Sequence, residues 1–295
     1  MGRALAEAFP VARQTFEEAN DALGFDLAEL CFNGPEEQLR LTEFTQPAIF
    51  TASVAALRVL AEAGATADYF AGHSLGEYSA NVAAGTIDFA AAARTVRRRG
   101  QLMQEAVPAG QGAMAAILGM PAETVLAVCQ DASRELGAPV EPANMNSPEQ
   151  TVISGATAAV ERAIALAKER GARRAVLLQV SAPFHCSLMQ PAQDALAPGL
   201  QGLPFLPAKV PVVVNVDAAL VAEPEALRDA LVRQVTGAVR WTESMQLLIA
   251  QGVTSFVEVG PGKVLSGLLR QIDRSQKCAQ AEDPASIAKL LAPLS

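Results

Sequence analysis

A single serine stands between two glycines in the run GHSLG at residues 72–76. The spacing G-x-S-x-G is typical of a strand-to-helix elbow, where the chain turns so sharply that a bulky residue on either side of the serine would clash. The same letters also occur in ordinary loops, so their surroundings decide. Residues 68–72 are short and apolar enough for a buried strand, and residues 75–83 have helical spacing. Ser74 is therefore predicted to be a nucleophile held in an elbow.

The segments around the elbow indicate an α/β protein. Apolar spacing predicts helices at residues 10–23, 47–63, 75–83 and 89–105. Two of them begin with a proline, Pro10 and Pro47, whose missing N–H is harmless in a first turn. Further along, strands are expected at residues 210–214 and 255–259, and helices at residues 224–234, 242–250, 263–272 and 284–291. This alternation predicts a three-layer, α/β-hydrolase-like main body.

Between residues 111 and 181 the pattern changes. Strands and helices follow each other there in the order β-α-β-β-α-β, which is the split unit of a ferredoxin-like fold. The prediction is a discontinuous main body, made of residues 1–110 and 182–295, that carries an inserted ferredoxin-like α+β subdomain at residues 111–181.

Composition narrows the class of protein. The 295 residues carry a net charge of -8, which argues against nucleic acid as a partner. No run approaches the roughly 18 apolar residues of a membrane span, and charges occupy the N-terminus where a signal peptide is apolar, so the cytoplasm is expected. The 4 cysteines are scattered without a C-x-x-C pair. They indicate buried thiols, and neither a metal site nor a cofactor is expected.

Only 2 histidines are present, His73 and His185. A serine hydroxyl needs a base, and imidazole is the side chain best suited to that task at neutral pH. If the residues before it are extended, His73 points away from Ser74. His185, which follows the last strand of the insertion, is therefore the predicted base, although a partly buried structural histidine would fit the same position. A third group must hold the imidazole, and Asp217 is the candidate for a hydrolase-like triad.

The transition state needs hydrogen-bond donors for its oxyanion. The backbone N–H of Leu75, at the start of the helix, is placed for this role and gains from the positive helix end. The residues do not indicate a second donor. Two basic clusters occur at residues 97–99 and 168–174. They are interpreted either as solvated helix faces or as a binding surface for an anionic partner.

Several further motifs occur in order along nearly the whole chain: TQPA at 45–48, GHSLGEYSA at 72–80, RG at 99–100 before MQEA, NMNSP at 144–148, PFHC at 183–186 and VEVGPGKVLSGL at 257–268. Together they resemble the malonyl-coenzyme A:acyl carrier protein transacylase family, the acyltransferases of bacterial fatty acid synthesis and relatives of polyketide acyltransferase domains. The resemblance implies ping-pong transfer of a malonyl group from malonyl-coenzyme A to the phosphopantetheine thiol of acyl carrier protein, by a monomer without a cofactor. Whether the product enters fatty acid or polyketide synthesis stays open.

The resemblance also implies roles for individual residues. Ser74 carries the acyl group, His185 is its base, and the backbone carbonyl of Gln234 orients the imidazole in place of Asp217. Arg99, which alone would be interpreted as part of a solvated charge run, binds the malonyl carboxylate. The chemistry suits this role, because a guanidinium fork can bind a carboxylate through two parallel hydrogen bonds.

Three more positions match the family's substrate cleft. Phe184 resembles the aromatic residue that narrows the space beside the α-carbon in malonyl-selective polyketide domains. Since one methyl group contributes about 1–3 kcal/mol of discrimination, this predicts a preference for malonyl over methylmalonyl. Gln46 and Asn144 match polar positions near the cleft.

The family pattern also bears on the start of the chain and on docking. Family members carry a strand and a Gly-Gln-Gly-Ser-Gln loop, which supplies the second oxyanion donor, ahead of the position that matches Met1. Both are expected to be missing here. Carrier proteins are acidic, so productive docking predicts a basic patch that includes Arg97, Arg98, Arg173 and Arg174.

Two alternatives remain at this point. A serine hydrolase or thioesterase shares the elbow, but it usually has its histidine late in the chain, and none follows His185. The second alternative is an inactive, truncated homologue that binds carrier protein. The expected loss of the Gly-Gln-Gly-Ser-Gln loop is the reason to retain it.

Overall fold

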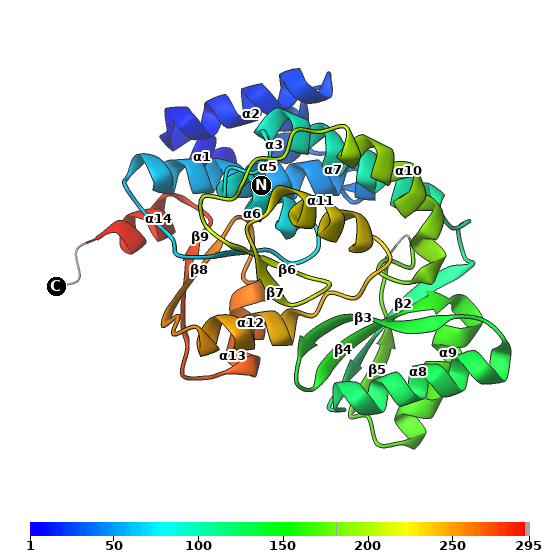
Figure 1. The fold of residues 1–295 in the computed structure, drawn as a ribbon. Coiled ribbons are helices and arrows are strands. Elements are labelled where there is room, and N and C mark those ends of the chain that lie inside the picture. Colours follow the sequence, from blue (N-terminus) through cyan, green and yellow to red (C-terminus); the bar gives the residue numbers. More distant parts are fainter. Residues whose placement is uncertain (181, 293–295) are drawn as a thin grey trace.

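A computed structural model of the protein describes residues 1–180 and 182–292. Figure 1 shows a body in which helices lie on both sides of the central strands, and a smaller unit of strands and helices at one end. This arrangement confirms the predicted fold class of a three-layer α/β body with a ferredoxin-like subdomain.

The central strands are short, and the middle one is buried along its whole length. β1 (Phe70–Ala71) pairs in parallel with β6 (Val212–Val214), and β7 (Ala219–Val221) pairs with β6 in the antiparallel direction. A separate parallel pair is formed by β8 (Ser255–Val259) and β9 (Lys277–Ala281). Alternate side chains of β6 enter different hydrophobic clusters, which is what a sheet covered on both faces requires.

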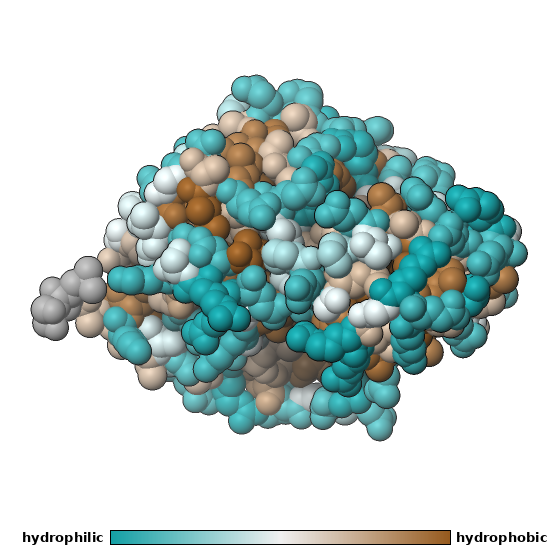
Figure 2. All heavy atoms as spheres, turned by 90° about the horizontal axis from the view of Figure 1, so that it is seen from below, coloured by the Kyte–Doolittle hydropathy of each residue, from teal (hydrophilic) through white to brown (hydrophobic). Residues whose placement is uncertain are grey.

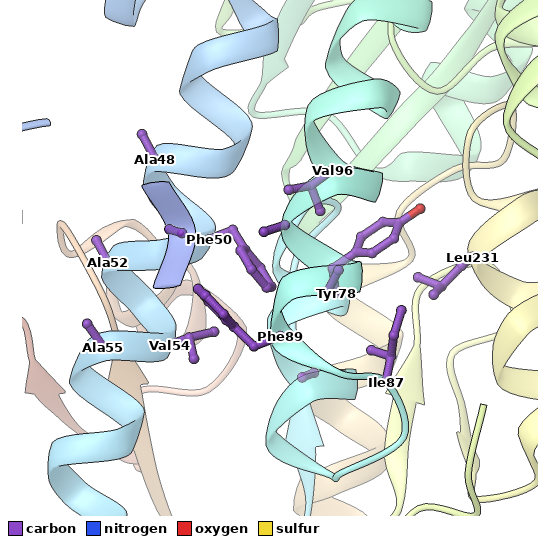
Figure 3. Packing of buried hydrophobic residues seen from close by; sticks show 14 of the residues in the cluster. Ala48, Phe50, Ala52, Val54, Ala55, Tyr78, Ile87, Phe89, Val96 and Leu231 are labelled. Atoms are coloured by element: carbon purple, nitrogen blue, oxygen red, sulfur yellow. The ribbon is translucent and has the colours of Figure 1, made fainter. Parts of the chain in front are cut away.

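Helices supply most of the core. Figure 3 shows Phe50 and Phe89 facing each other between two of them, with ring centroids 5.2 Å apart. The helices of the main body are α1 (Arg3–Ala8), α2 (Pro10–Leu23), α3 (Leu27–Asn33), α4 (Glu36–Leu39), α5 (Thr42–Glu62), α6 (Gly76–Ala83), α7 (Phe89–Glu105), the 3-10 turn η1 (Ser187–Met189), α10 (Gln190–Gln201), α11 (Pro224–Arg233), α12 (Trp241–Ala250), α13 (Val264–Ile272) and α14 (Pro284–Leu291).

The subdomain consists of β2 (Gly112–Leu118), α8 (Ala122–Leu136), β3 (Val140–Ser147), β4 (Gln150–Ala156), α9 (Thr157–Glu169) and β5 (Arg174–Leu177). Its antiparallel sheet has the order β3-β4-β2-β5, and α8 and α9 form a hydrophobic cluster of their own with it. These elements follow the expected β-α-β-β-α-β order. The domain limits at residues 111 and 181 stay a prediction, and position 181 lies outside the described residues.

Two backbone hydrogen bonds join the subdomain to the main body. Val239 N–H donates to the carbonyl of Ala143 at 2.8 Å, and Met145 N–H donates to the carbonyl of Val239 at 2.9 Å. Val239 therefore extends the edge of the subdomain sheet by one residue, next to β3.

One predicted helix start is wrong. α5 begins at Thr42, so Pro47 lies inside the helix and not in its first turn. The first turn forms upstream because the carbonyl of Leu41 accepts hydrogen bonds from the amides of Phe44 and Thr45. Pro47 has no backbone N–H, so one hydrogen bond of the helix is not formed, and the residue is buried. The sequence also gave no indication of α1, α3, α4, α10, β7 or β9.

In the described part of the chain, α5 is the one helix that is long and apolar enough to cross a membrane. This was not predicted from the sequence, because only uninterrupted apolar runs were considered there. However, 61% of its apolar window is buried inside the protein, where it packs against α7 and α2. We therefore interpret it as a core helix. Figure 2 shows hydrophilic residues mixed with smaller hydrophobic areas over the lower face of the molecule.

Candidate active site

Ser74 lies between the end of β1 and the start of α6, as the elbow motif predicts. Its φ of 53° is in the left-handed region, which non-glycine residues rarely adopt and which costs about 1–3 kcal/mol. Asn215 stabilises this conformation from the neighbouring strand end. Its Oδ1 accepts from the Ser74 N–H at 2.7 Å, and its Nδ2 donates to the carbonyl of Gly72 at 2.7 Å.

The two glycines of the elbow are not equivalent. A Cβ atom on Gly72 would lie 1.9 Å from the carbonyl oxygen of Gly76, so a larger residue at this position requires the backbone to shift. A Cβ atom on Gly76 would meet nothing within 4 Å. The expectation of a clash on both sides of the serine is therefore wrong at Gly76, because that residue already belongs to α6 and its α-carbon faces open space.

This difference gives a matched pair of variants. Gly72→Ala is expected to destabilise the fold by about 3 kcal/mol, because backbone must move to make room for the methyl group. Gly76→Ala is expected to change stability by less than about 1 kcal/mol, since alanine is a better helix residue than glycine. Urea denaturation of both variants measures the two values. Equal losses would contradict the assignment of the clash to Gly72.

Ser74 and His185 are in direct contact. Ser74 Oγ lies 2.7 Å from His185 Nε2, and His185 Nδ1 lies 2.9 Å from the backbone carbonyl of Gln234. Because a carbonyl oxygen can only accept, Nδ1 carries the hydrogen and Nε2 is left to accept the serine proton. Asp217, the carboxylate candidate, instead forms an ion pair with Arg233 at 2.7 Å.

Burial sets the charge state of His185. It lowers the pKa of the imidazole to about 3, with a smaller contribution from the positive charge of Arg99. The neutral ring is therefore the form present at physiological pH, which is the form that can accept a proton.

The same pKa shift predicts a pH dependence of stability. The unfolded chain binds a proton at residue 185 below about pH 6.5, whereas the folded protein does so only near pH 3, so acidification across this window favours unfolding. Relative to His185→Gln, wild type is expected to lose about 2 kcal/mol between pH 7 and pH 5. Urea denaturation at both pH values measures the difference. Parallel stability curves for the two proteins would show that His185 titrates normally.

Arg99 is a buried cation next to the serine. It is 2% exposed, its Nη1 donates to Gln46 Oε1 at 2.7 Å, and its Nη2 donates to Gln234 Oε1 at 2.9 Å and to Ser74 Oγ at 3.1 Å. None of the ion pairs within 4.0 Å among the described residues includes Arg99. Neutral amide oxygens hold the guanidinium while its charge stays uncompensated. The arrangement can therefore attract an anionic group to the serine.

The neighbouring arginines lie elsewhere. Arg97 donates to the carbonyl of Leu23 at 3.0 Å and covers the ring of Phe25, so it joins α7 to the segment after α2. Arg98 is exposed. Of the three consecutive arginines, only Arg99 lines the cleft described next.

A cleft of about 670 Å³ opens between the main body and the subdomain. Seven of the eight predicted site residues line it, and Gln234 lies beneath them in contact with Ser74 and His185. Phe184 also packs against the apolar face of the subdomain sheet. The lining consists of Arg40, Thr42, Thr45, Gln46, His73, Ser74, Leu75, Arg99, Met103, Met114, Asn144, Leu178, Gln179, Val180, Phe184 and His185.

The amide of Leu75 is available as a donor. The next three amides along the chain are occupied, because they donate to the carbonyls of His73, Ser74 and Leu75 itself. The Leu75 N–H takes part in no backbone hydrogen bond among the described residues. Among the described residues, no backbone carbonyl of α6 accepts a hydrogen bond from the Leu75 N–H.

Sequence reasoning missed Asn215 and Glu77, which support the site from behind. Glu77 Oε2 accepts from the Asn215 N–H at 2.9 Å and from Gln234 Nε2 at 2.7 Å. The available signals were a lone asparagine after three valines and an acidic residue inside the apolar start of a helix. His73 was expected to point away from Ser74, and its Nε2 lies 2.8 Å from Asn146 Oδ1.

A metal centre finds no support in the described part of the chain, where no three histidine, cysteine, aspartate or glutamate side chains gather. Three cysteines are buried and one is partly buried. The site is therefore built from a serine, an imidazole and a guanidinium, which suits acyl transfer through a covalent serine ester.

Comparison with known proteins agrees with this chemistry. A family model described as an acyl transferase domain matches residues 1–292. The chain belongs to the acyl transferase family. This acyltransferase is 49% identical over 287 residues to the malonyl CoA-acyl carrier protein transacylase of Bacillus subtilis, covering 97% of this chain and 90% of the relative. It is also 49% identical over 288 residues to the enzyme of the same name from Escherichia coli, covering 97% and 93%.

Solved structures are equally similar. The malonyl CoA-acyl carrier protein transacylase of Coxiella burnetii matches the acyltransferase with a TM-score of 0.96 and 43% identity, over 99% of this chain and 92% of the other. A malonyl-transacylase in complex with its acyl-carrier protein from a type II polyketide synthase matches with a TM-score of 0.95 and 50% identity, over 99% and 94%.

Proposed function

We propose that this acyltransferase moves a malonyl group from malonyl-coenzyme A to the phosphopantetheine thiol of an acyl carrier protein. The observation that carries the proposal is Arg99, a buried cation without an ion-pair partner among the described residues, whose Nη2 lies 3.1 Å from Ser74 Oγ. A malonyl thioester bears a carboxylate beyond its reacting carbonyl, whereas an acetyl thioester does not. The names of the relatives support the same substrate.

The first half-reaction forms the acyl-enzyme. Ser74 Oγ attacks the thioester carbonyl while His185 Nε2 takes its proton, and the Gln234 carbonyl holds the imidazolium through Nδ1. The Leu75 N–H donates to the oxyanion at the positive end of α6. When the tetrahedral intermediate collapses, the carbon–sulfur bond breaks and the proton passes from His185 to the departing coenzyme A thiolate.

The second half-reaction reverses these roles. The phosphopantetheine thiol gives its proton to His185 and attacks the malonyl-serine ester, and the proton then returns to Ser74 Oγ. Arg99 holds the malonyl carboxylate in both steps, with Gln46 and Gln234 holding Arg99. Phe184 limits the room beside the α-carbon, and Asn144 supplies a polar wall to the cleft. No cofactor enters the cycle, and we propose a cytoplasmic monomer as the working form.

The proposal is tested by incubating the protein with malonyl-coenzyme A and measuring its intact mass. The expected result is a malonyl adduct on Ser74 that disappears when holo acyl carrier protein is added, as the carrier gains the same mass. Ser74→Ala is the control and should take up nothing. Rapid release of free malonate without a carrier would instead support a hydrolase, and no adduct at all would support a binding protein without activity.

Docking of the carrier is proposed at the edge of the subdomain. Arg173 and Arg174 are exposed at the start of β5, and the residues that follow this strand, Leu178 to Val180, line the cleft. Arg97 is removed from the expected patch, because it is engaged with Leu23 and Phe25.

Charge reversal tests this surface. The double variant Arg173→Glu with Arg174→Glu is expected to slow malonyl transfer to the carrier about 10-fold at low salt, with the difference shrinking as salt screens the charges. Transfer rates from the preformed malonyl-enzyme at low and high salt measure the effect. Arg134→Glu on α8 is the control, since this exposed arginine belongs to the same subdomain. Unchanged rates and salt dependence in the double variant would place docking elsewhere.

A further inference from the structure

Glu77 is a buried carboxylate that the reaction cycle above does not use. It is 0% exposed and lies in the first turn of α6, three residues after Ser74. One oxygen, Oε2, accepts both hydrogen bonds described above, from Asn215 N–H and Gln234 Nε2. The other, Oε1, has no hydrogen-bond partner among the described residues. Burying a carboxylate costs free energy, and the hydrogen bonds of Glu77 show which groups it holds in place.

The Gln234 side chain connects Glu77 to the substrate arginine. Its Nε2 donates to Glu77 Oε2 at 2.7 Å and to the Ser74 carbonyl at 3.0 Å, and its Oε1 accepts from Arg99 Nη2 at 2.9 Å. An amide can rotate by 180° with almost no change in shape. A rotated amide would turn its NH₂ toward the guanidinium and its oxygen toward the carboxylate, which is repulsive at both ends. An ionised carboxylate, which can only accept, therefore selects the orientation that Arg99 needs.

The amide also keeps the two charges apart. If Glu77 contacted Arg99 directly, the ion pair would neutralise the guanidinium and compete with an acyl carboxylate for its N–H groups. With Gln234 between them, Glu77 determines where Arg99 lies while leaving its charge uncompensated at short range.

We propose that Glu77 is a positioning residue for substrate selection, which fixes the Gln234 amide and thereby aims Arg99 at the carboxylate of the acyl group. The inference rests on the proposed function, since it assumes that Arg99 receives that carboxylate. A second contact acts on the serine, because Glu77 also holds Asn215, which fixes the elbow. The elbow contact affects every acyl group alike, whereas the contact of the Gln234 amide oxygen with Arg99 acts on acyl groups that carry a carboxylate.

This distinction gives the test. We expect Glu77→Gln to lower kcat/KM for malonyl-coenzyme A about 10-fold more than for acetyl-coenzyme A, because a neutral amide no longer imposes one orientation on Gln234. Gln234→Leu, which removes the side chain but keeps the backbone carbonyl that holds His185, should shift the malonyl-to-acetyl ratio in the same way. The double variant should shift the ratio no further than either single variant, since both act through one contact.

The pH profile of the ratio is a second readout that a merely structural residue would not move. Burial raises the pKa of Glu77 to about 7, opposed by the hydrogen bonds from Asn215 and Gln234 and by the charge of Arg99, and reinforced by Asp217. Other titratable groups near this network are Tyr78, His185 and Arg233. In wild type the malonyl-to-acetyl ratio should rise as the pH passes through about 7 and Glu77 ionises, and in Glu77→Gln it should stay flat.

The outcomes separate the two proposals. If wild type does not prefer malonyl-coenzyme A, or if Arg99→Ala keeps the preference, the proposed function of Arg99 fails. If wild type and Arg99→Ala behave as expected but Glu77→Gln and Gln234→Leu lower both substrates in equal proportion, Glu77 is only structural and the inference is overturned. Should Glu77→Gln not fold, which circular dichroism reveals, the ratio of Gln234→Leu and the pH profile of wild type decide the question.

Discussion

His185→Ala is expected to slow acylation of Ser74 by malonyl-coenzyme A by roughly 100- to 10,000-fold, the range that general base catalysis contributes. Among the described residues, the other side chain that contacts Ser74 Oγ is Arg99, whose Nη2 can only donate, so no second group takes the serine proton when the imidazole is removed. Rapid-quench measurement of the malonyl adduct by intact mass gives the rate.

Asp217→Asn is the control for this variant. It removes the carboxylate that residue types alone favour as the third member of a triad, and it is expected to change the rate by less than about 5-fold, because an exposed ion pair contributes only about 0–1 kcal/mol. The Gln234 carbonyl stays in place to hold Nδ1. A loss in Asp217→Asn as large as that in His185→Ala would reject the carbonyl as the orienting group.

Arg99→Ala is expected to lower kcat/KM for malonyl-coenzyme A by about 100-fold or more, since two charge-assisted hydrogen bonds of about 1.5–3 kcal/mol each disappear. The value for acetyl-coenzyme A should fall much less, because that substrate has no carboxylate to lose. Arg99→Lys should restore little, because an ammonium cannot form the parallel pair of bonds. Steady-state kinetics with both thioesters measure the change in selectivity.

The matched control is Arg98→Ala, which removes an exposed arginine from the next position of the same helix. It should leave both values of kcat/KM within about 2-fold of wild type. If Arg98→Ala and Arg99→Ala reduced malonyl loading equally, the effect would come from the general charge of α7 and not from a specific carboxylate site.

Much of the fold could be predicted from apolar periodicity. α2 and α7 begin and end at the predicted residues, because both have one strongly apolar face and a clear N-terminal signal, Pro10 in one case and Asp88 in the other. β9 and β7 were missed for a physical reason. Both are short, only partly buried strands whose pattern carries no strong alternation, and pairing with β8 and β6 defines them.

The candidate site was predictable where the side chain itself carries the chemistry. Ser74 has the elbow motif, and His185 is one of only 2 imidazoles in the chain. The orienting group could not be found from residue types, because any residue has a carbonyl and only the fold decides which one faces Nδ1. The same holds for Glu77 and Asn215, whose contact joins residues 138 positions apart.

The segment after α11 has two tasks in this structure. The carbonyls of Gln234 and Gly237 lie 2.9 and 3.2 Å from His185 Nδ1, and two residues later Val239 is hydrogen-bonded on both sides to β3. One stretch of six residues thus ties the base of the reaction to one wall of the cleft. The alignment of the proton-accepting imidazole and the position of one wall of the cleft therefore depend on the same six residues.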